Sequence, residues 1–269
     1  MIYHFNIIIL LFSCFLIACR HAPKADDLAL DHGFKKQLVN TEDFAITTYQ
    51  KILTNDKDYV FYIEGDGRVL LKGKSISIDP TPKNNTLFSL ACLDKRPNVV
   101  YVSRPCQYTP KELNLKCYNN KYWTNARYSK EIVDSMRSAI NQIAGNNNYS
   151  LVGYSGGGAI AMLVSIANPK VKDITTIAGN LDIHEFQKYH KVNYTMSESL
   201  NPIDYINFTK HIKQLHLSGA KDKIVPTLIA KKFTEASASG MVNLKIIPNA
   251  SHKDGWQEIW PAILNTASL

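Results

Sequence analysis

A six-residue segment, GYSGGG at residues 153–158, separates a strand-forming run from a helix-forming run. The residues before it, 149–153, read as a buried strand, and those after it, 156–167, read as a helix. Only a tight turn remains between the two. Glycine on both sides of Ser155 permits a backbone conformation that a β-carbon would crowd. The segment therefore predicts a sharp strand-to-helix turn that holds the Ser155 hydroxyl at the edge of a sheet.

Alternating strands and helices continue along most of the chain. Buried strands separated by helices require crossover connections, so the pattern predicts an α/β fold with a mostly parallel central sheet and helices on both faces. Two insertions, 106–123 and 180–200, follow strands, where open parallel sheets bind ligands. The expected strands are 44–53, 59–67, 97–105, 149–153, 171–179, 213–220 and 242–250, and the expected helices are 84–96, 128–145, 156–167, 201–212, 226–237 and 260–264.

The N-terminal residues have the pattern of an export signal. Residues 1–18 contain no Lys, Arg, Asp or Glu, and their apolar run from Ile7 to Ala18 is short for a membrane span. The next residues complete LIAC, which resembles a bacterial lipobox and implies lipidation of Cys19; an ordinary signal peptide cut nearby is the alternative. His4 stands where such signals usually have Lys or Arg. We expect a lipoprotein signal peptide over 1–18, a polar tether over 19–43 and one α/β domain over 44–269.

The charge pattern bears on partners and location. The formal net charge of +8 lies entirely after residue 18, but no compact basic cluster with interleaved aromatic residues suggests nucleic acid. A solvated basic face explains the excess more simply than a specific anionic partner. We expect the domain to face the periplasm or the exterior of a bacterial envelope, held to a membrane by its lipid anchor. Arg20, in place of the Asp that often retains lipoproteins at the inner membrane, favours the outer membrane.

Three cysteines lie beyond the N-terminal segment. Cys106 and Cys117 belong to one irregular stretch, whereas Cys92 falls on the apolar side of an expected helix. Exported proteins meet oxidising conditions, so we expect a disulfide between Cys106 and Cys117. No Cys-x-x-Cys or His-x-x-x-His spacing occurs, and neither a metal nor an organic cofactor is expected.

A serine nucleophile needs a base, and the base needs a group that orients it. Asp222 comes just after the expected strand 213–220, and His252 comes just after the next, 242–250. The chain order Ser, Asp, His after successive strands is the order of an α/β-hydrolase triad. The sequence therefore predicts Ser155 as nucleophile, His252 as base and Asp222 as its acidic partner.

Other residues compete for these roles. Asp182 follows the preceding strand and is the alternative acid. His184 and His190 lie in the second insertion, where they either line a substrate pocket or have structural or surface roles. Asp254, close to His252, is expected to cap the last helix.

Hydrolysis also needs two donors for the oxyanion of the tetrahedral intermediate. The backbone N–H of Gly156 is one candidate, and the N–H of Asp66, in the YIEGDG segment after an early strand, is the other. Carboxylates beside an oxyanion are unfavourable, so Glu64 and Asp66 must turn away, be hydrogen-bonded or be partly protonated. The expected partners of these carboxylates are Arg68, Arg104 or Arg127.

From about Phe44 onward, the chain resembles the α/β-hydrolase superfamily and, within it, a group of bacterial envelope hydrolases that includes lipoproteins. The resemblance implies hydrolysis of an ester, thioester or amide through Ser155, Asp222 and His252, and it supplies no role for Arg104, Trp123 or Asn180. The segments that carry it are YIEGDG, RPCQY, YW with ARYS, GYSGGGAIA, TIAGNLD, SLNP and SHKDGW.

The doubled glycine after Ser155 also resembles the elbow of prolyl-oligopeptidase-type serine peptidases. Too few residues precede the hydrolase segment to form the propeller domain of those enzymes, so we expect an esterase. The sequence thus predicts an exported serine hydrolase that forms an acyl-enzyme with a small-molecule or envelope acyl substrate. A peptidase or acyltransferase on the same fold, and a non-catalytic envelope binding protein, are the alternatives.

Overall fold

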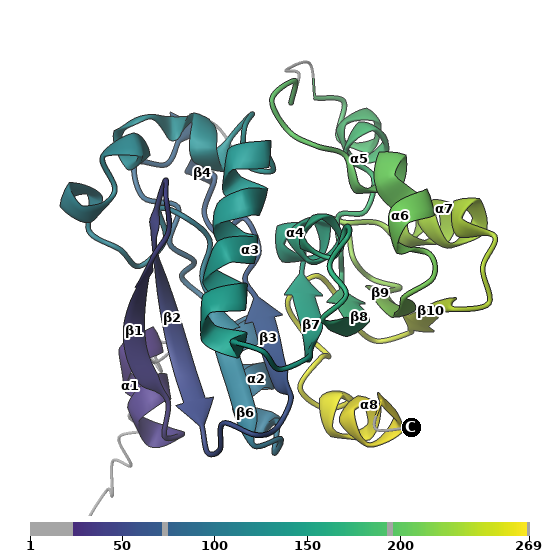
Figure 1. Cartoon of the computed structure of the whole chain (residues 1–269). Helices are drawn as coiled ribbons and strands as arrows, with labels where there is room; N and C mark the ends of the chain where they lie inside the picture. Colours follow the sequence, from purple (N-terminus) through teal and green to yellow (C-terminus); the bar gives the residue numbers. More distant parts are fainter. Residues whose placement is uncertain (1–23, 72–74, 193–195, 268–269) are drawn as a thin grey trace, which may run out of the picture.

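The computed structural model describes residues 24–71, 75–192 and 196–267, so the predicted signal peptide 1–18 and the lipidation candidate Cys19 lie outside the described residues. An eight-stranded sheet forms the centre (Figure 1). Its strands are β1 Lys35–Asn40, β2 Ala45–Ile52, β3 Tyr59–Ile63, β6 Asn98–Val102, β7 Tyr149–Tyr154, β8 Val171–Ile177, β9 Lys213–Gly219 and β10 Val242–Ile247, and a separate small sheet pairs β4 Leu70–Leu71 with β5 Ser75–Ile76. The α-helices are α1 Ala25–Asp31, α2 Thr86–Leu93, α3 Lys130–Ala144, α4 Gly156–Val164, α5 Ile183–Tyr189, α6 Ile206–Thr209, α7 Thr227–Ser237 and α8 Trp260–Ala267.

The central sheet is mostly parallel. Its strand order is β1-β2-β6-β3-β7-β8-β9-β10. Strands β6 through β10 in this order pair in parallel, and only β2 runs against its neighbours. Because the parallel strands share one direction, their carboxyl ends meet at one edge of the sheet. The prediction of an α/β fold with a mostly parallel sheet is confirmed.

Helices cover both faces of the sheet and enclose two apolar cores. Figure 1 shows α3 and α4 in front of the sheet and α2 behind it. Residues of α3, α4 and α7, including Ile132, Ile160 and Ile229, belong to one buried cluster. Residues of α1, α2 and α8, including Leu87 and Trp260, belong to the other. None of the helices in the three described ranges is long and apolar enough to cross a bilayer.

Local sequence explains the boundaries of α3, the longest helix. Ser129 caps its N-terminus, because the Ser129 hydroxyl accepts a hydrogen bond from the Ile132 N–H. Gly145 ends it with a positive φ of 58°, which glycine adopts without steric cost. The helix therefore starts and ends as the residues predict, and its apolar side packs on the sheet.

The structure differs from the predicted tether over 19–43. Within that range, α1 and the edge strand β1 fold onto the domain, and β1 pairs antiparallel with β2. Ala25, Ala29 and Phe34 are buried, and the Phe34 ring makes an edge contact with Phe88 at a centroid distance of 5.3 Å. Few of the residues in 24–43 are apolar and buried, and they are interspersed with charged residues. The sequence of this segment therefore has no clear apolar pattern. The described part of the predicted tether packs on the domain as α1 and β1.

Both insertions also contain more structure than the sequence indicates. Three short 3-10 helices, Lys111–Leu113, Leu115–Tyr118 and Asn120–Trp123, fold the first insertion, and α5 occupies part of the second. The predicted helix over 201–212 is a 3-10 turn, Pro202–Tyr205, followed by the short α6.

The first insertion is closed by the predicted disulfide between Cys106 and Cys117, whose Cα atoms lie 5.5 Å apart. Both sulfur-bearing residues are buried. A disulfide stabilises the folded state mainly by restricting the unfolded chain. For a loop of this length, reduction of the bond is expected to lower the free energy of unfolding by about 3 kcal/mol. Urea denaturation with and without reductant measures the change.

The double variant Cys106→Ala/Cys117→Ala is the control for the disulfide prediction. It should lose its response to reductant, while Cys92→Ala, which removes the one unpaired thiol of residues 24–267, should keep it. Equal unfolding midpoints for the oxidised and reduced wild-type protein would mean that the bond contributes no stability.

Candidate active site

Ser155 occupies a sharp turn between β7 and α4. Its backbone has φ 52° and ψ −121°, a conformation that residues other than glycine rarely adopt. The surrounding glycines make the turn possible: a β-carbon at Gly153 would lie 2.4 Å from the Gly157 carbonyl oxygen, and one at Gly157 would lie 2.1 Å from the Ile63 carbonyl oxygen. The strained conformation and close packing have the form of a nucleophile elbow.

Three side chains from different loops meet at this turn. His252 Nε2 lies 3.1 Å from the Ser155 Oγ, and His252 Nδ1 lies 2.8 Å from the Asp222 Oδ2. Ser155 follows β7, Asp222 follows β9 and His252 follows β10, so all three stand at the carboxyl edge of the parallel sheet. The structure therefore brings the three predicted residues into one hydrogen-bonded chain.

The other oxygen of Asp222 holds the carboxylate in place. Asp222 Oδ1 accepts hydrogen bonds from the backbone N–H groups of Ile224, at 2.8 Å, and Val225, at 2.9 Å. The Asp222 side chain is fully buried, whereas the His252 side chain is 12% exposed. This arrangement leaves one acidic oxygen facing the imidazole and excludes water from behind it.

The backbone of His252 is anchored as well. The Tyr154 hydroxyl and the Trp256 indole N–H both donate to the His252 carbonyl, at 2.9 Å and 3.1 Å. Tyr154 lies directly before Ser155, so the strand that carries the serine also positions the histidine. These contacts fix the ring relative to the hydroxyl it faces.

The two competing acids have other structural roles, whereas His190, unlike His184, lines the cavity beside Ser155. Asp182 caps α5, since its carboxylate accepts from the N–H groups of His184 and Glu185. Asp254 does not cap α8 as predicted, because it closes a turn in which its carboxylate accepts from the Ser251 hydroxyl at 2.9 Å. His184 is exposed. His190 Nε2 lies 2.7 Å from the Ile224 carbonyl oxygen, beside the loop that carries Asp222.

The EGDG loop lies directly beside the elbow. The predicted strand 59–67 ends at Ile63, which pairs with Gly153 of β7, so the following residues form a loop next to Ser155. A β-carbon at Gly65 would lie 3.2 Å from the Ser155 β-carbon. One at Gly156 would lie 2.0 Å from the Asp66 Oδ1. The backbone of this loop is thus close enough to face a group bound at Ser155.

The Asp66 carboxylate points into a buried cationic cluster. It lies 3.3 Å from the Arg104 Nη1 and 3.3 Å from the Arg127 Nε, and it accepts a hydrogen bond of 2.7 Å from the Tyr128 hydroxyl. Two of the three arginines expected as partners therefore hold this carboxylate. Arg68, the third, donates instead to the Asp79 carbonyl.

Glu64 is turned into the protein. Its carboxylate accepts from the Tyr101 hydroxyl at 2.6 Å and from the Gly65 N–H at 2.7 Å. Burial raises the pKa of Glu64 to about 7, against the opposing effect of these hydrogen bonds. The residue is thus hydrogen-bonded and partly protonated near neutral pH, which removes the conflict between an acidic side chain and a nearby oxyanion.

The raised pKa of Glu64 predicts a pH-dependent stability. The folded protein keeps a proton up to about pH 7 that the unfolded chain loses at about pH 4.3, so this contribution is complete below pH 4.3 and is lost as the pH rises through 7. The total loss of unfolding free energy across this pH range is about 4 kcal/mol. In Glu64→Gln, the decrease in unfolding free energy from pH 5 to pH 8 should be smaller than in the wild type. The exposed Glu258→Gln serves as control in urea denaturation, and equal pH dependence in all three proteins would contradict the assignment.

A cavity of about 780 Å³ opens over Ser155 and His252. Asn180, which follows β8, is buried at its wall, and its N–H donates to the Ser155 carbonyl at 2.9 Å. The Asn180 Oδ1 has no hydrogen-bond partner among the described residues. The sequence alone predicts no role for Asn180, although its position directly after a central strand is a signal that could have marked it. The apolar part of the lining consists of Val69, Leu70, Pro82, Phe186, Val192, Ile224 and Val225.

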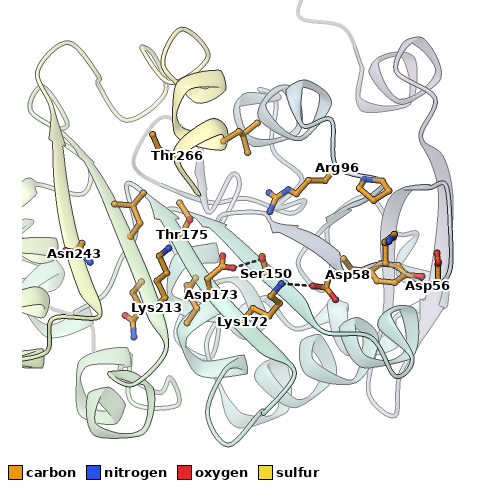
Figure 2. A pocket seen from close by; sticks show the side chains of 17 residues that line it. Asp56, Asp58, Arg96, Ser150, Lys172, Asp173, Thr175, Lys213, Asn243 and Thr266 are labelled. Atoms are coloured by element: carbon orange, nitrogen blue, oxygen red, sulfur yellow. Dashed lines mark hydrogen bonds and ion pairs between the residues drawn. The ribbon is translucent and has the colours of Figure 1, made fainter. Parts of the chain in front are cut away.

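A second cavity, of about 800 Å³, lies at the opposite end of the sheet. Figure 2 shows two of its polar contacts: Ser150 donates to Asp173 at 2.8 Å, and Lys172 pairs with Asp58 at 2.7 Å. Its lining residues include no histidine beside a serine. Nor does any group of His, Cys, Asp and Glu in the described ranges have the arrangement of a metal site. The candidate active site is therefore the cavity over Ser155.

Comparison with solved structures identifies the fold. Est1E from Butyrivibrio proteoclasticus superposes with a TM-score of 0.60 at 11% identity, over 87% of this chain and 97% of the other. The Pyrococcus furiosus esterase Pf2001 gives a TM-score of 0.60 at 12% identity, over 89% and 90%. The Pyrococcus horikoshii acylaminoacyl peptidase gives 0.62 at 10% identity, over 87% of this chain but 41% of the peptidase. No family model and no curated protein sequence matches this chain. At these identities the likeness shows the fold, which is the α/β-hydrolase fold, as predicted.

Proposed function

We propose that this chain, which has the α/β-hydrolase fold, is a serine hydrolase that cleaves an ester or a related acyl bond through an acyl-enzyme. The observation that carries the proposal is the chain of hydrogen bonds from Asp222 through His252 to Ser155 at the base of an open cavity. A strained elbow, a buried acid and an anchored histidine meet there. This combination is what nucleophilic acyl transfer requires.

The reaction would proceed in two acyl transfers. The Ser155 Oγ attacks the acyl carbon while its proton passes to the His252 Nε2, and the imidazolium then protonates the departing alcohol. Water attacks the resulting acyl-serine, again with proton transfer to His252, and the carboxylic acid leaves as Ser155 recovers its proton. Asp222 orients the ring through Nδ1 and stabilises the imidazolium in both steps.

The oxyanion would be bound by backbone N–H groups of Gly156 and Asp66. Gly156 begins α4, whose N-terminal end favours developing negative charge. Asp66 belongs to the loop that packs beside Ser155, and its carboxylate is held away by Arg104 and Arg127. The close packing at Gly156 supports this role, since no larger residue fits there without displacing Asp66.

The direct test of the proposal is turnover of activated acyl substrates by the full-length chain in mild detergent. We expect hydrolysis of p-nitrophenyl esters of short fatty acids, and much slower release of p-nitroaniline from matched acyl anilides. Faster cleavage of acylated amino acid anilides would favour a peptidase, a reading also supported by the likeness to acylaminoacyl peptidase. Absence of turnover from all of these by a folded protein would favour an envelope binding role.

We also propose that the protein is exported and anchored to a membrane through a lipid on Cys19, with its domain facing the periplasm or the exterior. The lipobox-like LIAC and the uncharged segment before it support this location. The Cys106–Cys117 disulfide is consistent with an oxidising compartment. Radiolabelled palmitate should be incorporated into the wild type and not into Cys19→Ala; equal labelling of both would contradict the anchor.

A further inference from the structure

The cavity over Ser155 has an excess of positive charge along its walls. Four basic residues line it, whereas the acidic residues of its lining are Glu64 and Asp66. The histidines of the lining are His190 and His252, which add no fixed negative charge. The four basic residues are Arg68, Lys83, Arg127 and Lys253.

Both acidic side chains of the lining are already engaged by the protein. Asp66 lies between two guanidinium groups, those of Arg104 and Arg127, so that cluster holds one carboxylate against two cations. Glu64 is buried against Tyr101, and its pKa of about 7 leaves it partly neutral. Neither carboxylate is placed to balance the rest of the positive wall.

The basic groups differ in how they reach the cavity. Arg127 is 4% exposed, and its guanidinium lies beside the Asp66 carboxylate. Arg68 donates only to a backbone carbonyl, and its Nε has no hydrogen-bond partner among the described residues. Lys83 and Lys253 are exposed at the rim, and neither forms an ion pair within the described ranges. A buried cation and three partly or fully exposed ones therefore surround the path to the serine.

Three further acids lie near this wall, and none of them is in the cavity lining. Asp79 lies beside Arg68, and its carboxylate accepts from the Thr81 N–H at 2.9 Å. Asp222 lies behind the His252 ring and is fully buried. Asp254 lines a neighbouring depression rather than the cavity, and its carboxylate accepts from Ser251. Low-dielectric walls lined with one sign of charge concentrate the field inside a cleft. An anion that enters this cavity is thus attracted, and a cation is repelled.

We propose that the site selects acyl substrates that carry an anionic group, such as a carboxylate, sulfonate or phosphate, within a few bonds of the scissile carbonyl. This inference rests on the proposed hydrolase function of Ser155. The apolar part of the lining accommodates the hydrocarbon portion of the substrate, and the four cations attract the charge. Lys253 directly follows the base His252 in the chain and lines the same cavity as Ser155.

The test compares three p-nitrophenyl esters of similar length with the full-length chain: the neutral pentanoate, the anionic sulfobutyrate and the cationic trimethylammoniobutyrate. A sulfonate is chosen because it is a poor internal nucleophile. At low ionic strength, kcat/KM should be about tenfold higher for the anion than for the neutral ester and lower still for the cation. The anionic preference should shrink as salt is added, because rim charges are screened.

Variants then assign the preference to the cavity. In Lys83→Glu/Lys253→Glu, the ratio of kcat/KM for the anionic ester to that for the cationic ester should fall by about a hundredfold, since two attractive charges become repulsive. The matched variant Lys213→Glu/Lys245→Glu reverses two exposed charges on β9 and β10, outside the cavity lining, and should leave the ratio unchanged. An equal effect of the two variants would attribute the preference to net charge rather than to the site.

The outcomes separate this inference from the proposed function. Hydrolysis of all three esters at similar rates, or preference for the cation, would overturn the anionic selectivity and leave the hydrolase intact. If none is cleaved, the rates of Ser155 labelling by fluorophosphonates with neutral and sulfonated tails provide the same comparison. No labelling of Ser155 by either reagent would refute the proposed function and the selectivity together.

Discussion

Replacement of Ser155 by alanine is expected to lower kcat for ester hydrolysis by about four to six orders of magnitude without unfolding the protein. Within the part of the chain that the structure describes, the Ser155 hydroxyl has a hydrogen-bond partner only in His252, and alanine fits the turn as well as serine does. His252→Ala should have a similar effect, because the hydroxyl then has no base. Initial rates with a p-nitrophenyl ester and circular dichroism measure activity and folding.

The double variant provides a sharper criterion than either single change. Ser155 and His252 act as one unit, so the kcat of Ser155→Ala/His252→Ala should be no lower than that of the less active single variant. Ser138→Ala, which removes a hydroxyl on α3 that accepts from Gln142, is the matched control and should keep full activity. A Ser155→Ala protein with wild-type turnover would show that another residue attacks the substrate.

Asp222→Asn is expected to lower kcat by about ten-thousandfold, whereas Asp182→Asn should change it less than tenfold. An asparagine at 222 would keep the shape but lose the negative charge, and its amide would favour the wrong tautomer of His252. Asp182 caps α5 through two backbone N–H groups, so its replacement acts on that helix rather than on the base.

Steady-state kinetics of the two aspartate variants, each checked for its unfolding midpoint, measures the ranking. The reverse order, with Asp182→Asn the more damaging change at equal stability, would move the acid to the loop after β8. The hydrogen bonds from Ile224 and Val225 to Asp222 would then have only a structural role.

The positions of the three candidate catalytic residues could be predicted because local pattern and topology agree. Each follows an apolar strand, and parallel strands bring their carboxyl ends to one edge. The turn at Ser155 is predictable from its glycines, because a β-carbon added at Gly153 or Gly157 would collide with backbone atoms. Order along the chain then selects Asp222 and His252 among several candidates.

The features that the sequence analysis missed depend on contacts between distant segments. β1 is mostly exposed, so its pairing with β2 leaves no alternating apolar pattern to read. Arg104 and Arg127 both contact Asp66, although Arg104 is 38 positions from Asp66 in the sequence and Arg127 is farther still. No local spacing indicates these contacts. Asn180 is recognisable only once the registers of β7 and β8 place it beside Ser155.

Mass spectrometry of the full-length protein after incubation with a fluorophosphonate, followed by peptide mapping, identifies the residue that reacts as a nucleophile. We expect a single adduct on Ser155 that forms about a hundredfold more slowly in His252→Ala, because the histidine activates the hydroxyl. No adduct on a folded protein, or an adduct on a different residue, would contradict the assignment of Ser155 as an activated nucleophile.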